Sequence, residues 1–308
     1  MPASWVAAST RARLLGDRRI GRVRAAAVAN SGGLGPALEM LRASPYGANV
    51  DPGMSLEAAQ RQVAATILWN VRVLAGWLPP GGSAILMPLA AWFEIANIEE
   101  RLAYLSGDRP SDPYQLGSLG MAWRAVSRAT SVDAVREGLT RSRWGDPGTS
   151  DPSDLVLALR FKWAGWVAGF VPGADAWAAT AVALLGARVR FGSTASPAGL
   201  PQIPGRIYGL PPGWQQVASL PQLRAIMSPR LAWVLDGVEE PSDLWVAEAR
   251  WWSRVEADAA QMVLRSRYGP SAVVGIAMLL GHDAWLTRAA LGAAARGGQA
   301  KGVFDAVA

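Results

Sequence analysis

Few residues of this chain have side chains that could do chemistry, and they are scattered. His282 is its only histidine and there is no cysteine. Disulfides, thiolate zinc sites and cysteine nucleophiles are therefore excluded, as is any reaction that needs two histidines. His282 lies between Gly281 and Asp283 at an expected helix start. We predict that it has a capping or surface role there and binds no ligand.

Two pairs of adjacent carboxylates, Glu99-Glu100 and Glu239-Glu240, are the next candidates. A general acid and a general base must converge on one reacting group, whereas neighbours on a helix point about 100° apart. We therefore interpret both pairs as solvated surface. Asn70 and Asn97 lie among apolar residues and are predicted to be partly buried amides that tether helices.

The usual catalytic motifs are also missing from the sequence. It has no GxxxxGK[ST] phosphate loop, no GxSxG elbow, no HExxH, and no glycine fingerprint after a strand. We assign no catalytic, cofactor-binding or metal-ligating residue, expect no cofactor, and predict that the chain is not an enzyme.

The net charge of +6 comes mainly from arginine. Such a surplus favours polyanionic partners, although a GC-rich genome produces the same composition. The arginines are spread through most of the expected helices, so nucleic-acid binding remains an alternative only. The densest group could line one surface and comprises Arg11, Arg13, Arg18, Arg19, Arg22 and Arg24.

Fifteen tryptophans are present, mostly at helical spacing among Leu, Val and Ala. Each ring buries about 150–250 Å², which favours core packing over ligand stacking. The nearest approach to a membrane span is Trp163–Ala187. Its central Pro172-Gly173 and Asp175 favour two buried helices joined by a tight turn. Charged residues crowd the N-terminal region, so no signal peptide is expected.

The chain should be almost entirely helical, because 3.6-residue apolar periodicity dominates and alternating β-branched runs are scarce. Ser55 is a plausible N-cap for a long helix that Pro79-Pro80 ends. Pro241-Ser242-Asp243 is expected to cap another long helix, to about Tyr268. Residues 194–212 are interpreted as a linker and 299–308 as a frayed tail.

One helix pattern recurs three times along the chain. Ala91–Gly107 and Ala176–Gly192 both begin with Ala-Trp and end at Gly, and a weaker copy occupies Ala284–Gly298. Around the first two copies the surrounding features recur in the same order: a short helix ending in aromatic-Gly, a polar loop, a long helix, a turn and the Ala-Trp helix. Around the third copy the order is looser. The repeat predicts three helical domains, at residues 1–108, 109–197 and 198–308.

The short helix supplies the most detailed match between copies. Leu139, Ser142, Trp144 and Gly145 have the same spacing as Leu41, Ser44, Tyr46 and Gly47. We therefore expect these two segments to be structurally equivalent.

Several of these motifs also resemble those of a known family. They are Trp5 with Arg11-Ala12-Arg13-Leu14-Leu15, then Ser44-Pro45-Tyr46-Gly47, then Glu94-Ile95-Ala96-Asn97-Ile98 through Gly107, and finally Tyr268-Gly269-Pro270 through Gly297. In this order, and over nearly the whole chain, they are similar to the C-type subunit of the archaeal and bacterial V-type rotary ATPase, the homologue of the eukaryotic d-type subunit.

The resemblance implies an all-α, funnel- or cup-shaped fold of three repeats around a pseudo-threefold axis. It implies a non-catalytic central-stalk subunit on the cytoplasmic face of the membrane. Such a subunit links the rotor shaft to the proteolipid ring and transmits torque for proton or sodium transport. The alternative from the residues alone is a freestanding basic helical scaffold that binds a protein or a nucleic acid.

Overall fold

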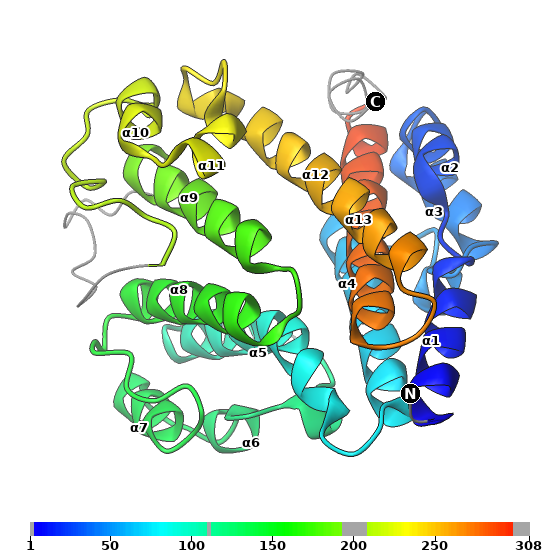
Figure 1. The fold of residues 1–308 in the computed structure, drawn as a ribbon, viewed down its shortest axis with the longest axis horizontal. Helices are drawn as coiled ribbons and strands as arrows, with labels where there is room; N and C mark the ends of the chain where they lie inside the picture. The colour runs from blue at the N-terminus through cyan, green and yellow to red at the C-terminus, as the bar shows by residue number, and fades with distance from the viewer. Residues whose placement is uncertain (1–2, 110–111, 193–207, 298–308) are drawn as a thin grey trace. The chain divides into compact units, whose positions relative to one another are not determined.

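The computed structural model describes residues 3–109, 112–192 and 208–297 (Figure 1). Helix makes up 71% of the described residues, and these contain no strand, which confirms the all-α prediction. The predicted tail lies outside these residues, as does most of the predicted linker. Within them, no helix combines the length and apolar character that crossing a membrane requires.

The chain divides into two compact units. Unit 1 comprises the two terminal parts of the chain, residues 1–83 and 252–308. Its helices are α1 (Ala3–Gly16), α2 (Gly21–Ala29), α3 (Leu34–Arg42), α4 (Leu56–Trp77), the end of α12 (Leu244–Arg265) and α13 (Pro270–Ala295). A 3-10 turn at Gly47–Asn49 follows α3.

Helix α13 is the centre of unit 1. It is apolar around its whole circumference and most of its residues are buried, so it must be covered on every side. Helices α1, α2, α3 and α4 pack against it. Unit 1 is therefore built around the C-terminal helix of the chain, although its other helices come mostly from the N-terminal end.

Unit 2 spans residues 84–251. Its α-helices are α5 (Met87–Leu105), α6 (Trp123–Val126), α7 (Val132–Thr140), α8 (Pro152–Phe170), α9 (Asp175–Phe191), α10 (Leu220–Ile226), α11 (Pro229–Ala232) and the start of α12. Short 3-10 helices lie at Gly82–Ile85, Gly117–Leu119, Trp233–Leu235 and Pro241–Asp243.

The core of unit 2 forms where α5 packs against α8, with α6 and α7 closing one side. Ile95, Ile98 and Leu102 of α5 meet Leu155 and Leu159 of α8 there. The three α5 residues and Leu159 lie on the apolar stripes that the sequence periodicity predicts, whereas Leu155 does not. Fully burying each side chain stabilises the fold by about 1.5–3 kcal/mol.

Several local predictions are confirmed. The Ser55 side chain accepts a hydrogen bond from the backbone N–H of Ala58 and caps α4. Helices α8 and α9 are separated by a turn in which Gly173 has φ 75°. The apolar segment Trp163–Ala187 is therefore two helices, as predicted.

Two predictions about the recurring helix are wrong. Helix α5 begins at Met87, four residues before Ala91, because Pro88 fits the first turn of a helix. Ala284 begins no helix: the helix start expected beside it lies inside α13, which is continuous from Pro270 to Ala295. A Cβ at Gly281 would meet the Trp252 ring at an ordinary contact distance of 3.6 Å, so the helix accepts this glycine without requiring one.

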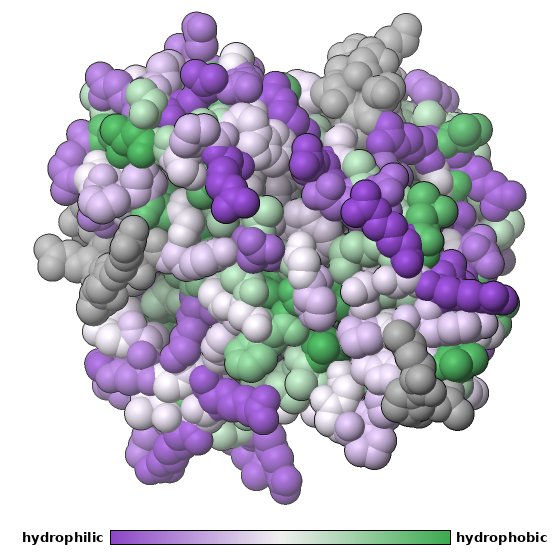
Figure 2. All heavy atoms as spheres, viewed as in Figure 1, coloured by the Kyte–Doolittle hydropathy of each residue, from purple (hydrophilic) through white to green (hydrophobic). Residues whose placement is uncertain are grey.

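Two predictions remain untested. They are the cup shape and the division into three domains at residues 1–108, 109–197 and 198–308. On the face shown in Figure 2, hydrophilic side chains are scattered over the surface and mixed with apolar ones.

Candidate functional site

The most constrained polar group of unit 2 is the carboxylate of Glu94, which is completely buried on α5. Its Oε1 accepts hydrogen bonds from the backbone N–H groups of Met121, Ala122 and Trp123, at 2.8, 2.7 and 2.8 Å. Its Oε2 accepts one from the indole Nε1 of Trp144 at 2.9 Å. A buried charge is tolerated only when it is hydrogen-bonded in this way.

The local sequence explains why these donors converge. The three N–H groups open α6, where a helix has no internal acceptors of its own. Gly120 precedes them, and a Cβ there would lie 3.7 Å from Glu94 Oε1. The carboxylate therefore caps a helix start and at the same time fixes the indole of Trp144.

Unit 1 contains the same arrangement around Asp283, which is buried on α13. Its Oδ1 accepts from the backbone N–H of Gly21 at 2.8 Å, and its Oδ2 accepts from that of Ile20 at 3.1 Å. These groups open α2. The Tyr46 hydroxyl donates to Oδ2 at 2.7 Å. Burial, and then the Asp283 charge, raise the pKa of Tyr46 well above its usual value, so this hydroxyl stays a donor.

We call these two arrangements carboxylate braces: a buried carboxylate on a long helix, the start of a short helix, and the aromatic residue of an aromatic-Gly turn. The two turns also match in detail. Ser44 Oγ donates to Leu41 O at 2.6 Å and accepts from the Tyr46 N–H at 3.2 Å. Ser142 Oγ donates to Leu139 O at 2.7 Å and accepts from the Trp144 N–H at 3.0 Å.

The glycine that follows each aromatic residue is required by the backbone. Gly145 has φ 62°, which is favourable only for glycine. At Gly47, a Cβ would lie 2.1 Å from the carbonyl oxygen of Arg42. The predicted equivalence of the two segments therefore extends to their hydrogen bonds, although Gly145 has a positive φ and Gly47 does not.

The braces show that the sequence alignment of the first and third Ala-Trp helices is shifted. Glu94 follows Trp92 by two residues, whereas Asp283 precedes Trp285 by two. The carboxylates are equivalent in structure, and the Ala-Trp pairs are not. The Ala-Trp match between Ala91 and Ala284 therefore misaligns the two helices by four residues, about one turn.

Helices α7 and α10 of unit 2 share a local pattern. Ser219 caps α10 as Ser131 caps α7, each accepting from the N–H three residues on. Five residues after each cap stands an arginine: Arg136 pairs with Asp146 at 2.8 Å, and Arg224 pairs with Asp236 at 2.6 Å. Both pairs join a short helix to the segment that follows it.

His282 does not have the predicted capping or surface role. It lies in the middle of α13 and is 1% exposed. Its Nδ1 is 3.5 Å from Glu256 Oε1, and its Nε2 has no hydrogen-bond partner among the described residues. Burial is the main cause that lowers the pKa of His282. The wrong prediction follows from treating Gly281 as a helix boundary.

The other candidates are nearer to expectation. Asn97 is buried and exchanges two hydrogen bonds with the backbone of Tyr114, at 2.9 and 2.7 Å, so it is a tether to a loop. Glu99 pairs with Arg160 at 2.7 Å on the surface. Glu239 and Glu240 are exposed. Neither pair of adjacent glutamates therefore lies in an enclosed site.

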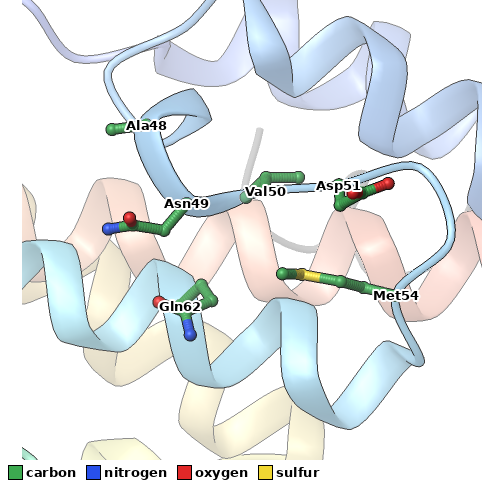
Figure 3. Close-up of a pocket in the computed structure, with 6 residues that line it drawn as sticks. All are labelled: Ala48, Asn49, Val50, Asp51, Met54 and Gln62. Atoms are coloured by element: carbon green, nitrogen blue, oxygen red, sulfur yellow. The ribbon is translucent and has the colours of Figure 1, made fainter.

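An open depression of about 580 Å³ lies on unit 1 (Figure 3), lined by Ala48, Asn49, Val50, Asp51, Met54 and Gln62. The Asp51 carboxylate accepts from the N–H of Gly53 within its own loop. Among the described residues, no group of three or more His, Asp or Glu side chains is placed to hold a metal ion.

Comparison with known proteins adds no assignment, because neither a family model nor a curated protein matches this chain.

Proposed function

We propose that this chain is a non-catalytic coupling subunit of a V-type rotary ATPase, equivalent to the C-type subunit of that machine. In this role it would sit on the cytoplasmic face of the membrane, between the proteolipid ring and the central shaft. It would need no cofactor, and its partners would be those two components.

The observation that carries the proposal is where the resembling motifs lie in the structure. Ser44-Pro45-Tyr46-Gly47 supplies the tyrosine of one brace, and Glu94-Ile95-Ala96-Asn97-Ile98 supplies the carboxylate of the other. The segments that resemble the family therefore perform the same structural task in two parts of the chain. This supports descent from a repeated helical unit, which is the architecture that the resemblance implies.

A coupling role also agrees with how the chain uses its buried polar groups. Transmission of torque requires a scaffold that does not yield under load. Each brace fixes three separate segments with several hydrogen bonds to one charged group, and bonds to charged groups contribute about 1.5–3 kcal/mol each. In the braces, side chains that could otherwise catalyse a reaction are committed to holding helices together.

The test is affinity purification of the full chain from gently solubilised membranes of its own cell. The proposal expects the proteolipid and the shaft subunits among the recovered proteins, in amounts comparable to the tagged chain. An untagged strain processed in parallel is the control. Recovery of the tagged chain without either component would refute the proposal.

The same purification distinguishes the scaffold alternative. If nucleic acid is recovered instead, oligonucleotide binding by the purified chain should weaken steeply with salt. A rotor subunit has no reason to show that behaviour.

A further inference from the structure

At one end of unit 1, three segments with exposed aromatic and basic side chains contain no acidic residue of their own. They are α1, the C-terminal part of α4, and the turn from α12 to α13 (Figure 1). The residue ranges 1–16, 58–83 and 259–281 contain no Asp or Glu. We call this end the acid-free end.

Hydrogen bonds fix this meeting of segments. Gln60, near the start of α4, donates to the carbonyl of Arg288, near the end of α13, at 2.9 Å. The two helices therefore run antiparallel, and α4 ends beside the start of α13. The Gly269 N–H donates to Ser9 Oγ of α1 at 3.0 Å. The Arg13 guanidinium donates to the carbonyls of Val263 and Ser266 at the end of α12.

The aromatic residues of this end are unusually exposed. Trp69 and Trp77 of α4 are 48% and 50% exposed, and Leu264 at the end of α12 is 76% exposed. Neither indole N–H of α4 has a hydrogen-bond partner among the described residues. By contrast, the indole N–H groups of Trp144, Trp163 and Trp251 all have acceptors.

Three exposed arginines of the acid-free end lack a carboxylate partner among the described residues. Arg72, Arg265 and Arg267 are exposed and form no ion pair with the described residues. Arg72 lies between the two tryptophans on the exposed side of α4. Many other arginines of the described chain do pair with a carboxylate, among them Arg22, Arg42, Arg136, Arg141, Arg160, Arg188, Arg224 and Arg254.

We infer that the acid-free end of unit 1 binds the surface of an anionic membrane. Tryptophan is enriched at membrane interfaces, where its ring lies among apolar groups and its N–H meets polar ones. Arginine without a protein acid is attracted to anionic headgroups. Protein surfaces that lie in the membrane–water interface without crossing the membrane typically combine Trp and Leu with Arg. A nucleic acid would explain the arginines but would leave Leu264 exposed.

The inference deepens the proposed function, because it names the part of the chain that would face the membrane beside the ring. It rests on that function only for the expectation that a membrane is near. The two can be tested separately, since vesicles contain no ring and no shaft.

The experiment is co-sedimentation of the full purified chain with vesicles of phosphatidylglycerol and phosphatidylcholine, beside vesicles of phosphatidylcholine alone. The test variant carries Arg72→Gln, Arg265→Gln and Arg267→Gln. The matched control carries Arg124→Gln, Arg128→Gln and Arg230→Gln, which are exposed arginines of unit 2. Both variants lose the same net charge, so a general charge effect weakens them equally.

We expect the wild-type chain to co-sediment with the anionic vesicles and not with the zwitterionic ones. Each arginine near the surface contributes about a fivefold change in binding, so the test variant should bind roughly a hundredfold more weakly. The control should change by less than about tenfold. A variant with Trp69→Ala and Trp77→Ala should also bind more weakly, including at raised salt, where charge attraction is screened.

Equal weakening of the test and control variants would overturn the inference, as would a wild-type chain that ignores anionic vesicles. Binding to oligonucleotides as tight as to vesicles would overturn it in favour of a general polyanion surface. The substituted arginines are exposed, so the arginine variants should keep the wild-type melting temperature. They therefore test membrane binding even if the tryptophan variant unfolds.

Discussion

Replacing Glu94 by glutamine tests whether the carboxylate brace stabilises unit 2. The amide keeps one oxygen for the N–H groups of Met121, Ala122 and Trp123, but it loses the charge. Its NH₂ group then faces the indole N–H of Trp144, so two donors oppose each other in a buried site. One charge-assisted bond contributes about 1.5–3 kcal/mol, and an unsatisfied buried donor costs about 1–3 kcal/mol.

We therefore expect Glu94→Gln to lower the free energy of unfolding by about 3 kcal/mol. For a unit of this size that corresponds to a fall in melting temperature of roughly 6–12 °C. Glu94→Ala, which leaves all four donors without an acceptor, should cost more. The assay is urea unfolding followed by far-ultraviolet circular dichroism, and the slope must be compared between variants because the two units can unfold separately.

A double-mutant cycle with Trp144→Phe makes the prediction specific. Phenylalanine removes the indole donor, so Glu94→Gln should cost less in that background, and the two changes should be non-additive by about 1–2 kcal/mol. Glu99→Gln on the exposed side of the same helix is the control and should change stability by less than about 1 kcal/mol. A Glu94→Gln variant within about 0.5 kcal/mol of the wild type, or a strictly additive cycle, would refute the reasoning.

Three further predictions follow from the same geometry. Tyr46→Phe should destabilise unit 1 by about 1.5–3 kcal/mol, since the Asp283 carboxylate loses a buried donor; a melting curve unchanged by the substitution would show that this hydroxyl bond contributes nothing. His282 has its pKa lowered from 6.5 by burial and by Arg22 and Arg19, so the unfolded chain binds more protons and stability should fall as pH decreases below about 6.5. His282→Gln should flatten this slope in melts between about pH 5 and 7, and equal slopes in both proteins would contradict the assignment. Gly209→Ala should cost more than about 2 kcal/mol, because φ is 83° and the new Cβ would meet the Ala179 carbonyl oxygen at 2.6 Å; Gly165→Ala, where a Cβ meets open space, is the control and should be neutral or stabilising.

The helices could be predicted from sequence because their signals are local. The Ser55 cap and the Pro172-Gly173 turn act over a few residues, and both are confirmed. The apolar stripes are confirmed at their centres, whereas Trp92 and Phe170 at their ends are 43% and 61% exposed. The equivalence of the two aromatic-Gly turns could also be predicted, since each turn is closed by hydrogen bonds over two or three residues.

The braces could not be predicted in the same way, because Asp283 bonds to residues more than 230 positions away in the chain. Nothing near Asp283 in sequence indicates those partners. A weaker signal existed for Glu94, an acidic residue on the same stripe as Ala91 and Ile98, where a charge must find buried partners. The place of α13 at the centre of unit 1 is equally non-local, although its all-round apolar character does indicate that other helices must cover it.

The most direct test of the coupling role is removal of this chain from its own cell, followed by measurement of how much of the ATPase head stays on the membrane. The account predicts that the proteolipid ring remains in the membrane, that the catalytic head is released, and that ATP-driven ion transport is lost. Re-expression of the wild-type chain should restore both attachment and transport. If the head stays attached and transport continues at the wild-type rate without this chain, the proposal is contradicted.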